Sequence, residues 1–219
     1  MYYRLPVKKE MERKKRTLLV YGEGTVTAQP DQAKLTLGVS TTNENVQSAQ
    51  QENAVRMNQV ITSIVNLGVP RDDIQTSQYR ITPQYDYVDG KRIFRGYEVV
   101  NLVEVTVDDL TMVGTILDTA VQHGANQIGN IQFLVSQPEQ YYQQALIQAV
   151  HQSFKKARAI VSAIRVTLDE TPISITELTE DRPLTLVKAA TYDTYEEITP
   201  ISPGTLDITA KVKSEFKYY

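Results

Sequence analysis

The chain has 219 residues, a net charge of −3 at pH 7, 41% hydrophobic and 22% charged residues, and no cysteine. These values are ordinary for a soluble globular protein, and the lack of cysteine excludes disulfides, thiolate catalysis and cysteine-based metal centres. No apolar run of about 18 residues is present, so we expect no membrane-spanning helix.

The first 16 residues, MYYRLPVKKEMERKKR, hold seven basic and two acidic side chains. We expect a flexible, solvated tail; contact with nucleic acid, anionic lipid or acidic surfaces of sister subunits is the alternative. No second basic stripe follows, so no nucleic-acid partner is expected. The apolar run of a signal peptide is not seen after the basic residues, so we expect a cytoplasmic protein unless a leader has been removed.

Residues 17–28 and 31–41 alternate between apolar and polar side chains, which predicts two strands. Pro30 cannot donate to a strand ladder and belongs in the connection, so we interpret the pair as a hairpin. The stretch Thr42-Asn43-Glu44-Asn45 offers residues that cap helices, and apolar residues follow at helical spacing from Val46 to Leu67.

Residues 74–87 and 93–107 form a second, tyrosine-rich pair of strands around Val88-Asp89-Gly90-Lys91, since Asp-Gly favours tight hairpin turns. A short helix is expected over 110–122 and a strand over 128–135. The longest helix should run from Pro138 to about Val166. Its small residues would let it lie close to a sheet; they are Ala145, Ala149, Ser153 and Ala157.

Residues 172–179 and 204–218 alternate as strands, and 181–202 has no clear period and is expected to be a long loop. The element order is β-β-α-β-β-α-β-α-β-β. It predicts an α+β fold with mainly antiparallel sheet and helices packed on the sheet faces. Residues 17–219 then form one domain, with two lobes, 17–107 and 108–219, as an alternative.

Short motifs occur in a fixed order along nearly the whole chain. They are Gly22-Glu23-Gly24, Pro30-Asp31, Asn53-Ala54, Gly68-Val69, Asp73-Ile74-Gln75-Thr76, Pro83-Gln84-Tyr85, Gly96-Tyr97, Asn101, Val107-Asp108-Asp109-Leu110, Gly124-Ala125-Asn126, Lys156-Ala157 and Pro200-Ile201-Ser202-Pro203-Gly204. In this order and spacing the chain resembles the SIMPL-domain family, which includes bacterial periplasmic immunogenic antigens and an oxidative-stress-defence protein.

The resemblance implies an α+β fold, ring-like or channel-like homo-oligomers, and no established enzyme activity. A link to stress or to the cell envelope is likewise implied by the resemblance alone. Residues 163–168 lack the glycines that relatives tend to have there. We therefore expect the long helix to end differently in this chain.

Candidate catalytic groups are few, and we expect no catalytic residue, no cofactor and no metal site. The two histidines, His123 and His151, have no partners at ligand spacing. Gly22-Glu23-Gly24 precedes another strand and not a helix, so a bulge or close strand packing is favoured over a phosphate loop. An acid-dependent hydrolase using Glu196 or Glu197 is the weakest alternative considered.

The composition is unusual in its 13 tyrosines with no tryptophan. Tyrosine is common at protein interfaces because it joins a large apolar ring to a polar tip, although an amphipathic sheet face in a monomer is the competing interpretation. The leading hypothesis is a non-enzymatic, self-assembling protein. The alternative is a monomeric or dimeric module that binds a ligand or partner protein beside the 181–202 loop. The expected interface residues are Tyr79, Tyr85, Tyr87, Tyr97, Tyr192 and Tyr195.

Overall fold

The computed structural model describes residues 16–178, 185–188, 199 and 201–219. The chain divides into two compact units, each made of separate stretches of sequence. Residue 107, the lobe boundary considered from the sequence, falls inside the second unit. The expected flexible tail, 1–16, lies outside the described residues apart from its last one. The first unit consists of Met1–Val26, Pro138–Leu184 and Asp207–Tyr219, and the second of Thr27–Gln137 and Thr185–Leu206.

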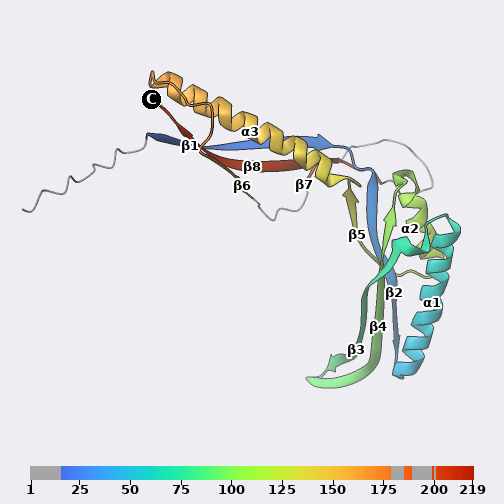
Figure 1. Ribbon diagram of the computed structural model, residues 1–219. Coiled ribbons are helices and arrows are strands. Elements are labelled where there is room, and N and C mark those ends of the chain that lie inside the picture. Colours follow the sequence, from blue (N-terminus) through green and yellow to red (C-terminus); the bar gives the residue numbers. More distant parts are fainter. Residues whose placement is uncertain (1–15, 179–184, 189–198, 200) are drawn as a thin grey trace, which may run out of the picture. The chain divides into compact units, whose positions relative to one another are not determined.

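The first unit is a sheet with one long helix packed along it (Figure 1). The strand path is β1-β8-β6, and β6 and β8 are antiparallel. Strand β8 alternates strictly, so Ser214 and Phe216 are buried while Glu215 between them stays partly exposed. The elements are β1 (Thr17–Ala28), α3 (Pro138–Ala163), β6 (Ser174–Leu178) and β8 (Thr205–Lys217).

Helix α3 approaches β1 so closely that no side chain fits on the strand at Gly22 or Gly24. A Cβ atom placed on Gly22 would overlap the carbonyl oxygen of Ala149 and lie 2.9 Å from the amide nitrogen of Ser153. A Cβ on Gly24 would likewise overlap the carbonyl oxygen of Ala145. The expected close packing of this glycine pair, and of the small-residue stripe of the helix, is confirmed.

The C-terminus of α3 differs from the expected end near Val166. The helix ends at Ala163, and Arg165 adopts a left-handed backbone conformation with φ of 57°. The amide of Val166 donates to the carbonyl of Val161 at 3.0 Å. This bond is typical of the Schellman motif at a helix C-terminus, in which the left-handed residue is usually glycine. A left-handed conformation costs a non-glycine residue about 1 kcal/mol or more. The helix therefore ends with a glycine-type turn although Arg165, and not glycine, occupies the left-handed position.

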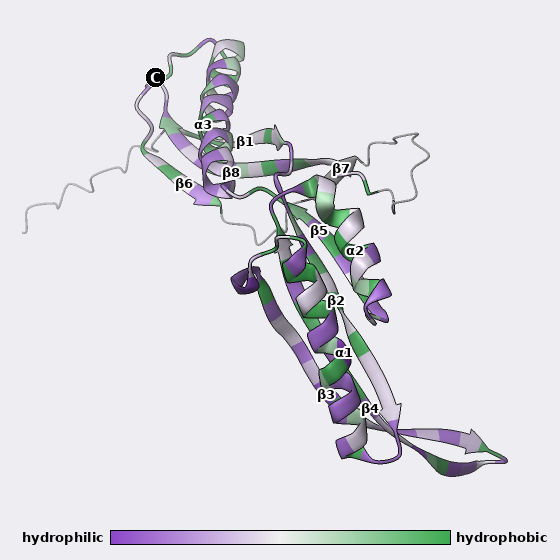
Figure 2. Cartoon of the chain, turned by 90° about the vertical axis from the view of Figure 1, so that its right-hand side faces the viewer, coloured by the Kyte–Doolittle hydropathy of each residue, from purple (hydrophilic) through white to green (hydrophobic). Residues whose placement is uncertain are grey.

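The second unit is a four-stranded sheet with α1 and α2 on one face (Figures 1 and 2). The strand order is β3-β4-β2-β5, and each neighbouring pair is antiparallel. Both helices contribute to one hydrophobic core with the inward side chains of β2 and β4. The elements are β2 (Gln32–Asn43), α1 (Val46–Asn66), η1 (Arg71–Asp73), β3 (Ile74–Val88), β4 (Lys91–Val107), η2 (Leu110–Met112), α2 (Val113–Gln122) and β5 (Gln127–Leu134). The short strand β7 (Thr185–Lys188) is not part of this sheet and pairs with β8.

The structure confirms the α+β class, the antiparallel sheets and the packing of helices on the sheets. The predicted hairpin of residues 17–28 and 31–41 is wrong. Strands β1 and β2 lie in different sheets. Asp31 instead joins β2 to the end of β5, because its carboxylate accepts hydrogen bonds from the amide (2.6 Å) and hydroxyl (2.7 Å) of Ser136. Alternation of apolar and polar residues identifies a strand but does not show which other strand it pairs with.

The expected long loop, 181–202, is also wrong in part, because it contains β7. This strand has four residues, which is too short for its alternation to stand out in the sequence. The other described residues of this stretch, Thr199, Ile201 and Ser202, lie outside any helix or strand.

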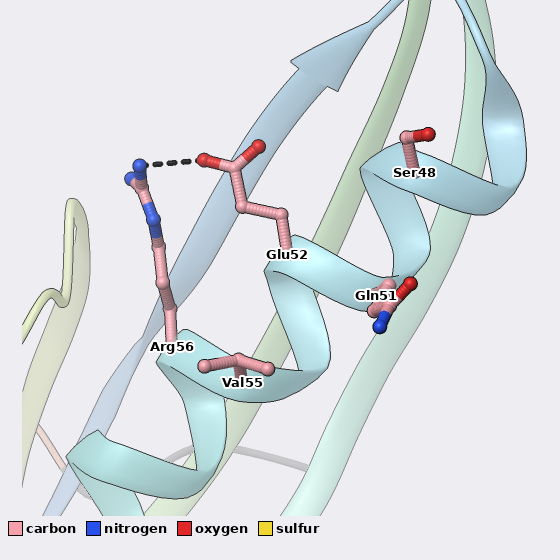
Figure 3. Close-up of a pocket in the computed structure, with 5 residues that line it drawn as sticks. All are labelled: Ser48, Gln51, Glu52, Val55 and Arg56. Carbon is pink, nitrogen blue, oxygen red and sulfur yellow. Dashed lines mark ion pairs between the residues drawn. The ribbon is translucent and has the colours of Figure 1, made fainter.

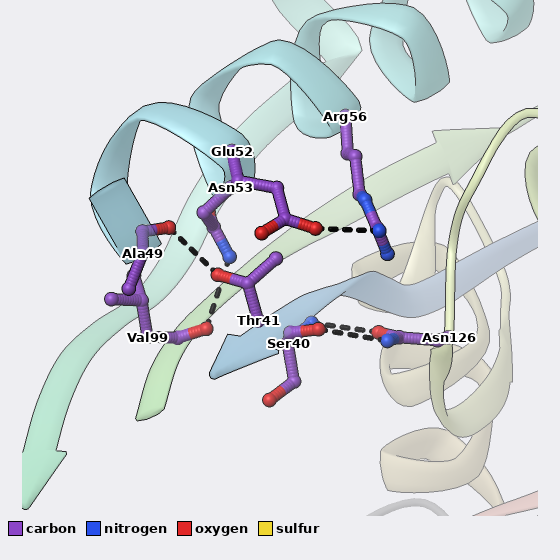
Figure 4. Close-up of polar contacts among 8 residues, drawn as sticks. All are labelled: Ser40, Thr41, Ala49, Glu52, Asn53, Arg56, Val99 and Asn126. Carbon is purple, nitrogen blue, oxygen red and sulfur yellow. Dashed lines mark hydrogen bonds and ion pairs between the residues drawn. The ribbon is translucent and has the colours of Figure 1, made fainter. Parts of the chain in front are cut away.

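A buried amide fixes α1 to the sheet (Figure 4). Asn53 is 1% exposed, and its Nδ2 donates to the carbonyls of Val39 on β2 (2.9 Å) and Val99 on β4 (3.0 Å). One turn earlier, the hydroxyl of Thr41 donates to the carbonyl of Ala49 at 2.8 Å. Buried polar groups cost free energy unless they are paired, so these bonds hold the helix at one position on the two strands.

The glycine pair gives a direct test of the α3–β1 contact. We expect Gly22→Ala to lower the free energy of unfolding by about 3 kcal/mol or more, because the new methyl group meets backbone that cannot move aside. Glu23→Ala is the matched control, since that side chain is exposed between the two glycines. Urea denaturation followed by far-UV circular dichroism measures both, and an equal loss in the two variants would contradict the contact.

Candidate functional site

The β3–β4 hairpin extends beyond the sheet to which it belongs. Strand β2 ends at Asn43, which pairs with Tyr97 of β4, so the earlier residues of β4 have β3 as their sheet neighbour. We call residues 84–96 the arm. It projects past the N-terminal end of α1 and curves away from the line of the sheet (Figures 1 and 2). A two-stranded ribbon without a core beneath it is marginally stable on its own in water.

The tip of the arm is a two-residue turn. Val88 pairs with Lys91, and both residues between them have positive φ, 49° at Asp89 and 76° at Gly90. Two positive φ angles define the type I′ turn, whose twist matches that of the flanking strands. The turn predicted from the Asp-Gly dipeptide is confirmed.

The base of the arm is a β-bulge. Gln84 pairs with Gly96, but its neighbour Tyr85 pairs with Phe94, so Arg95 is an extra residue on β4. Gly96 has φ of 138°, and a Cβ on it would lie 2.8 Å from the carbonyl oxygen of Asn43. A bulge bends the strand, and the side chains beyond it lie on the opposite face from the one that a regular strand would give them.

The bulge produces a continuous row of aromatic rings. Phe94 and Tyr97 are three residues apart, which in a regular strand would place them on opposite faces. Their rings instead meet edge to face with centroids 5.2 Å apart, and Phe94 meets Tyr85 in the same way at 5.7 Å. The guanidinium carbon of Arg92 lies 3.5 Å from the centre of the Tyr85 ring. Arg92, Tyr85, Phe94 and Tyr97 therefore form one row, which we call the aromatic row.

The aromatic row faces solvent to a degree that is unusual for such large side chains. Phe94 is 44% exposed, and Tyr87 nearer the tip is 74% exposed. Ile93 and Val88 expose about half of their surface on the opposite face of the arm. Contiguous apolar surface of this kind marks an interaction site more often than a single exposed side chain does.

Polar contacts hold the base of the arm against the sheet. The carboxylate of Glu98 accepts from Gln84 Nε2 on β3 (2.8 Å) and from the hydroxyl of Ser40 on β2 (3.0 Å). Further out, Arg95 and Asp86 form an exposed ion pair at 3.4 Å, which contributes little to stability. The arm is therefore fixed at its base, while its outer part depends on its turn and its aromatic row.

The structure places the expected interface tyrosines at three positions. Tyr85 and Tyr97 belong to the aromatic row, and Tyr87 lies between the row and the tip. Tyr79 lies apart, at the flank of α1, where its hydroxyl accepts from Gln50 Nε2 at 3.3 Å. Tyr192 and Tyr195 lie outside the described residues. Phe94 and Arg92 were not expected, because the sequence does not reveal the bulge that brings them into the row.

Other candidate sites have weaker support. A hollow of about 450 Å³ on α1 is lined by residues of this helix alone, and its charged side chains, Glu52 and Arg56, pair with each other at 2.6 Å (Figure 3). His123 ends α2, with its Nδ1 2.8 Å from the carbonyl oxygen of Thr119. Glu196 and Glu197 lie outside the described residues.

Two features are absent from the described part of the chain. None of its helices is long and apolar enough to cross a membrane. Its histidine, aspartate and glutamate side chains include no group of three or more placed to hold a metal ion.

Comparison with known proteins identifies one family. The SIMPL family model, described as a protein of unknown function (DUF541), matches residues 18–216. The chain is 30% identical to the uncharacterized protein YggE of Escherichia coli K12 over 145 residues, which cover 66% of this chain and 59% of the relative. It is 32% identical to the 26 kDa periplasmic immunogenic protein of Brucella melitensis over 166 residues, covering 74% and 66%. The match thus spans less than two thirds of the length of these relatives.

One expectation from the sequence is contradicted by these relatives. We expected a cytoplasmic protein, because no apolar run follows the basic residues at the start of the chain. The Brucella relative is named a periplasmic protein, which points to export and not to the cytoplasm. The expectation failed because it rested only on the absence of an apolar run, and an absence does not identify a compartment.

Phe94→Ala tests whether the aromatic row orders the arm. We expect the amides of residues 85–95 to become more mobile, because Phe94 joins Tyr85 to Tyr97. Global stability should change by less than about 1 kcal/mol, since no core lies beneath the arm. Amide order parameters from ¹⁵N relaxation and thermal melting measure the two effects. Ile93→Ala, on the opposite face, is the control, and unchanged order in Phe94→Ala would contradict the role of the row.

Proposed function

Since the chain belongs to the SIMPL family, whose model describes proteins of unknown function, we propose that it is a non-enzymatic, self-assembling protein. The arm is the proposed contact surface between copies. The observation that carries the proposal is the row of Tyr85, Phe94 and Tyr97, which lies on a ribbon with no core of its own.

The physical case rests on what a contact would supply to the arm. Aromatic residues and arginine are enriched at the centres of protein interfaces, and the row contains both. Burying Phe94, now 44% exposed, removes apolar surface from water and contributes free energy in proportion to the area buried. The ribbon itself would gain support that its own unit does not provide. A second copy offers the same apolar surface, so a symmetric contact is self-complementary.

The β1 edge of the other sheet is less available for contact between copies. Strand β1 ends the path β1-β8-β6, and side chains of α3 cover part of its outer backbone. Gln152 Oε1 accepts from the amide of Glu23, and Lys156 Nζ donates to the carbonyl of Tyr21, both at 2.8 Å. Covered strand edges resist pairing with another chain. This supports the arm, and not β1, as the contact surface.

We also propose that the protein acts in the cell envelope after export. The support is the printed name of the Brucella relative, a periplasmic immunogenic protein that is 32% identical to this chain. A link to stress defence is proposed on the family resemblance alone.

Solution mass tests the assembly. Light scattering during size exclusion should give a discrete mass several times 24.7 kDa, at both low and moderate salt. We expect the double variant Tyr85→Ser, Tyr97→Ser to lose this mass, because serine cannot replace the apolar area of the rings. Tyr21→Ser is the control, since Tyr21 is 54% exposed on β1.

Two results would contradict the proposal. A monomeric wild-type chain would exclude assembly as the main function. The alternative, a ligand-binding module, would then be tested by ligand screening. An oligomer that survives the double variant unchanged would show that another surface makes the contact.

Export is tested by cell fractionation. The protein expressed from its natural gene should appear in the periplasmic or envelope fraction, as the name of the Brucella relative suggests. A periplasmic enzyme and a cytoplasmic enzyme serve as markers for the two fractions. Recovery only with the cytoplasmic marker would contradict an envelope role.

A further inference from the structure

A cavity of about 460 Å³ lies in the second unit at the C-terminal end of α1. Its walls come from four segments of that unit: the chain after α1, η1, the end of β4, and the start of the η2–α2 helices. This volume falls within the range that holds small organic ligands. The lining residues have two chemical characters that differ in burial: the apolar side chains are buried or partly buried and form what we call the floor, and the carboxylates are partly or fully exposed and form what we call the rim.

The floor is apolar. It is built from five side chains that either belong to the hydrophobic core of the unit or pack against it: Leu67, Val69, Val107, Met112 and Ile116. Val69 and Val107 are less than a tenth exposed, and Leu67 and Met112 are partly exposed. An apolar group placed here would therefore extend the core and leave water.

The rim carries three carboxylates, from Asp73 on η1 and from Asp108 and Asp109 after β4. Asp108 accepts from Gln32 Nε2 at 2.8 Å. Hydrogen bonds from the hydroxyl and amide of Thr111 hold the pKa of Asp109 below its ordinary value, so this group is charged at neutral pH. The Asp73 carboxylate has no hydrogen bond or ion pair with the described residues.

Among the residues that the structure describes, no basic side chain lines the cavity. Leu67 and Gly68 of the lining follow α1 directly, so the cavity lies at the end of the helix where the dipole is negative. The last turn of α1 contains no basic residue to offset it. The nearby Arg71 directs its guanidinium to the carbonyl of Ile74, at 2.8 Å. The η2–α2 helices also begin at this cavity, where the dipole is positive, and Asp109 caps that end by accepting from the amide of Thr111 at 3.0 Å. Three carboxylates and the end of α1 outweigh this single helix start, so the electrostatic preference of the site is for a cation.

We infer that this cavity binds an ammonium group carried on an aliphatic chain. The cation would lie among the rim carboxylates of Asp73, Asp108 and Asp109, and the methylene groups would cover the floor of Val69, Val107 and Met112. Such a ligand is a free alkyl amine or a lysine side chain of another protein, and both present the same chemistry. An acid of equal length would meet three like charges.

The inference does not depend on the proposed assembly. The arm lies beyond the N-terminal end of α1, where Gly96 faces the backbone of Asn43, and the cavity lies at the C-terminal end. Changes at one should leave the other intact.

The test is a titration of the full chain with hexylammonium chloride, followed by ¹H–¹⁵N spectra at constant ionic strength. We expect shifts in the amides of residues 67–73 and 106–112. Shortening the ligand to butylammonium should weaken binding by at most about fourfold for each methylene removed. Hexanoate should bind much more weakly at the same site.

Asp73→Asn isolates the charge, because this carboxylate has no partner to lose among the described residues. We expect it to weaken hexylammonium binding about three- to fivefold, as for a single exposed ion pair. Asp72→Asn is the matched control, since Asp72 is exposed on the same short helix but does not line the cavity. Free lysine and a lysine-containing peptide, as further ligands, separate the two sources.

Four results would overturn the inference. They are no shifts at concentrations of tens of millimolar, shifts away from the cavity, equal binding of hexanoate, and equal losses in Asp73→Asn and Asp72→Asn. A fifth result, equal shifts with calcium chloride, would also overturn it, because an inorganic cation has no aliphatic chain to cover the floor. None of these results depends on the mass of the protein, so failure here and failure of the assembly proposal are distinguishable.

Discussion

The point at which β2 leaves the sheet determines the rest of the candidate site. Asn45 caps α1 by accepting from the amides of Gln47 (2.9 Å) and Ser48 (3.1 Å), and Asn43 Oδ1 accepts from the amide of Asn45 at 2.9 Å. These bonds turn the chain out of the sheet after Asn43. Beyond that point β3 and β4 have only each other. Gly96 lies against the turn, where a side chain would not fit, and its bulge bends the arm and aligns its rings.

Much of this architecture could be predicted from local sequence signals. The longer strands, the Asp89-Gly90 turn, a helix cap within residues 42–45 and the small-residue stripe of α3 follow from periodicity and turn chemistry that a single sequence displays. The partners of β1 and β2 could not be predicted, since strand pairing depends on residues far apart in the chain. Phe94 was missed for a related reason: a single extra residue changes which face it lies on, and no pattern in β4 shows that residue.

The second unit presents two different surfaces at the two ends of α1. At one end, large rings are exposed on a ribbon that lacks a core. At the other, core side chains form the floor of a cavity with a rim of carboxylates. Asn53, near the middle of the helix, bonds to β2 and β4 and holds the helix between these surfaces. Both features suit binding, and the proposal of a non-enzymatic protein is consistent with them.

In the proposed assembly, the arm is buried between copies of the chain. Hydrogen exchange at several protein concentrations tests it most directly, because a free ribbon exchanges quickly and a buried one does not. If copies bury the arm, amides of residues 85–95 become protected as concentration rises, while amides in the core of β2 keep the same protection. Exchange in the arm that is fast and independent of concentration would contradict it.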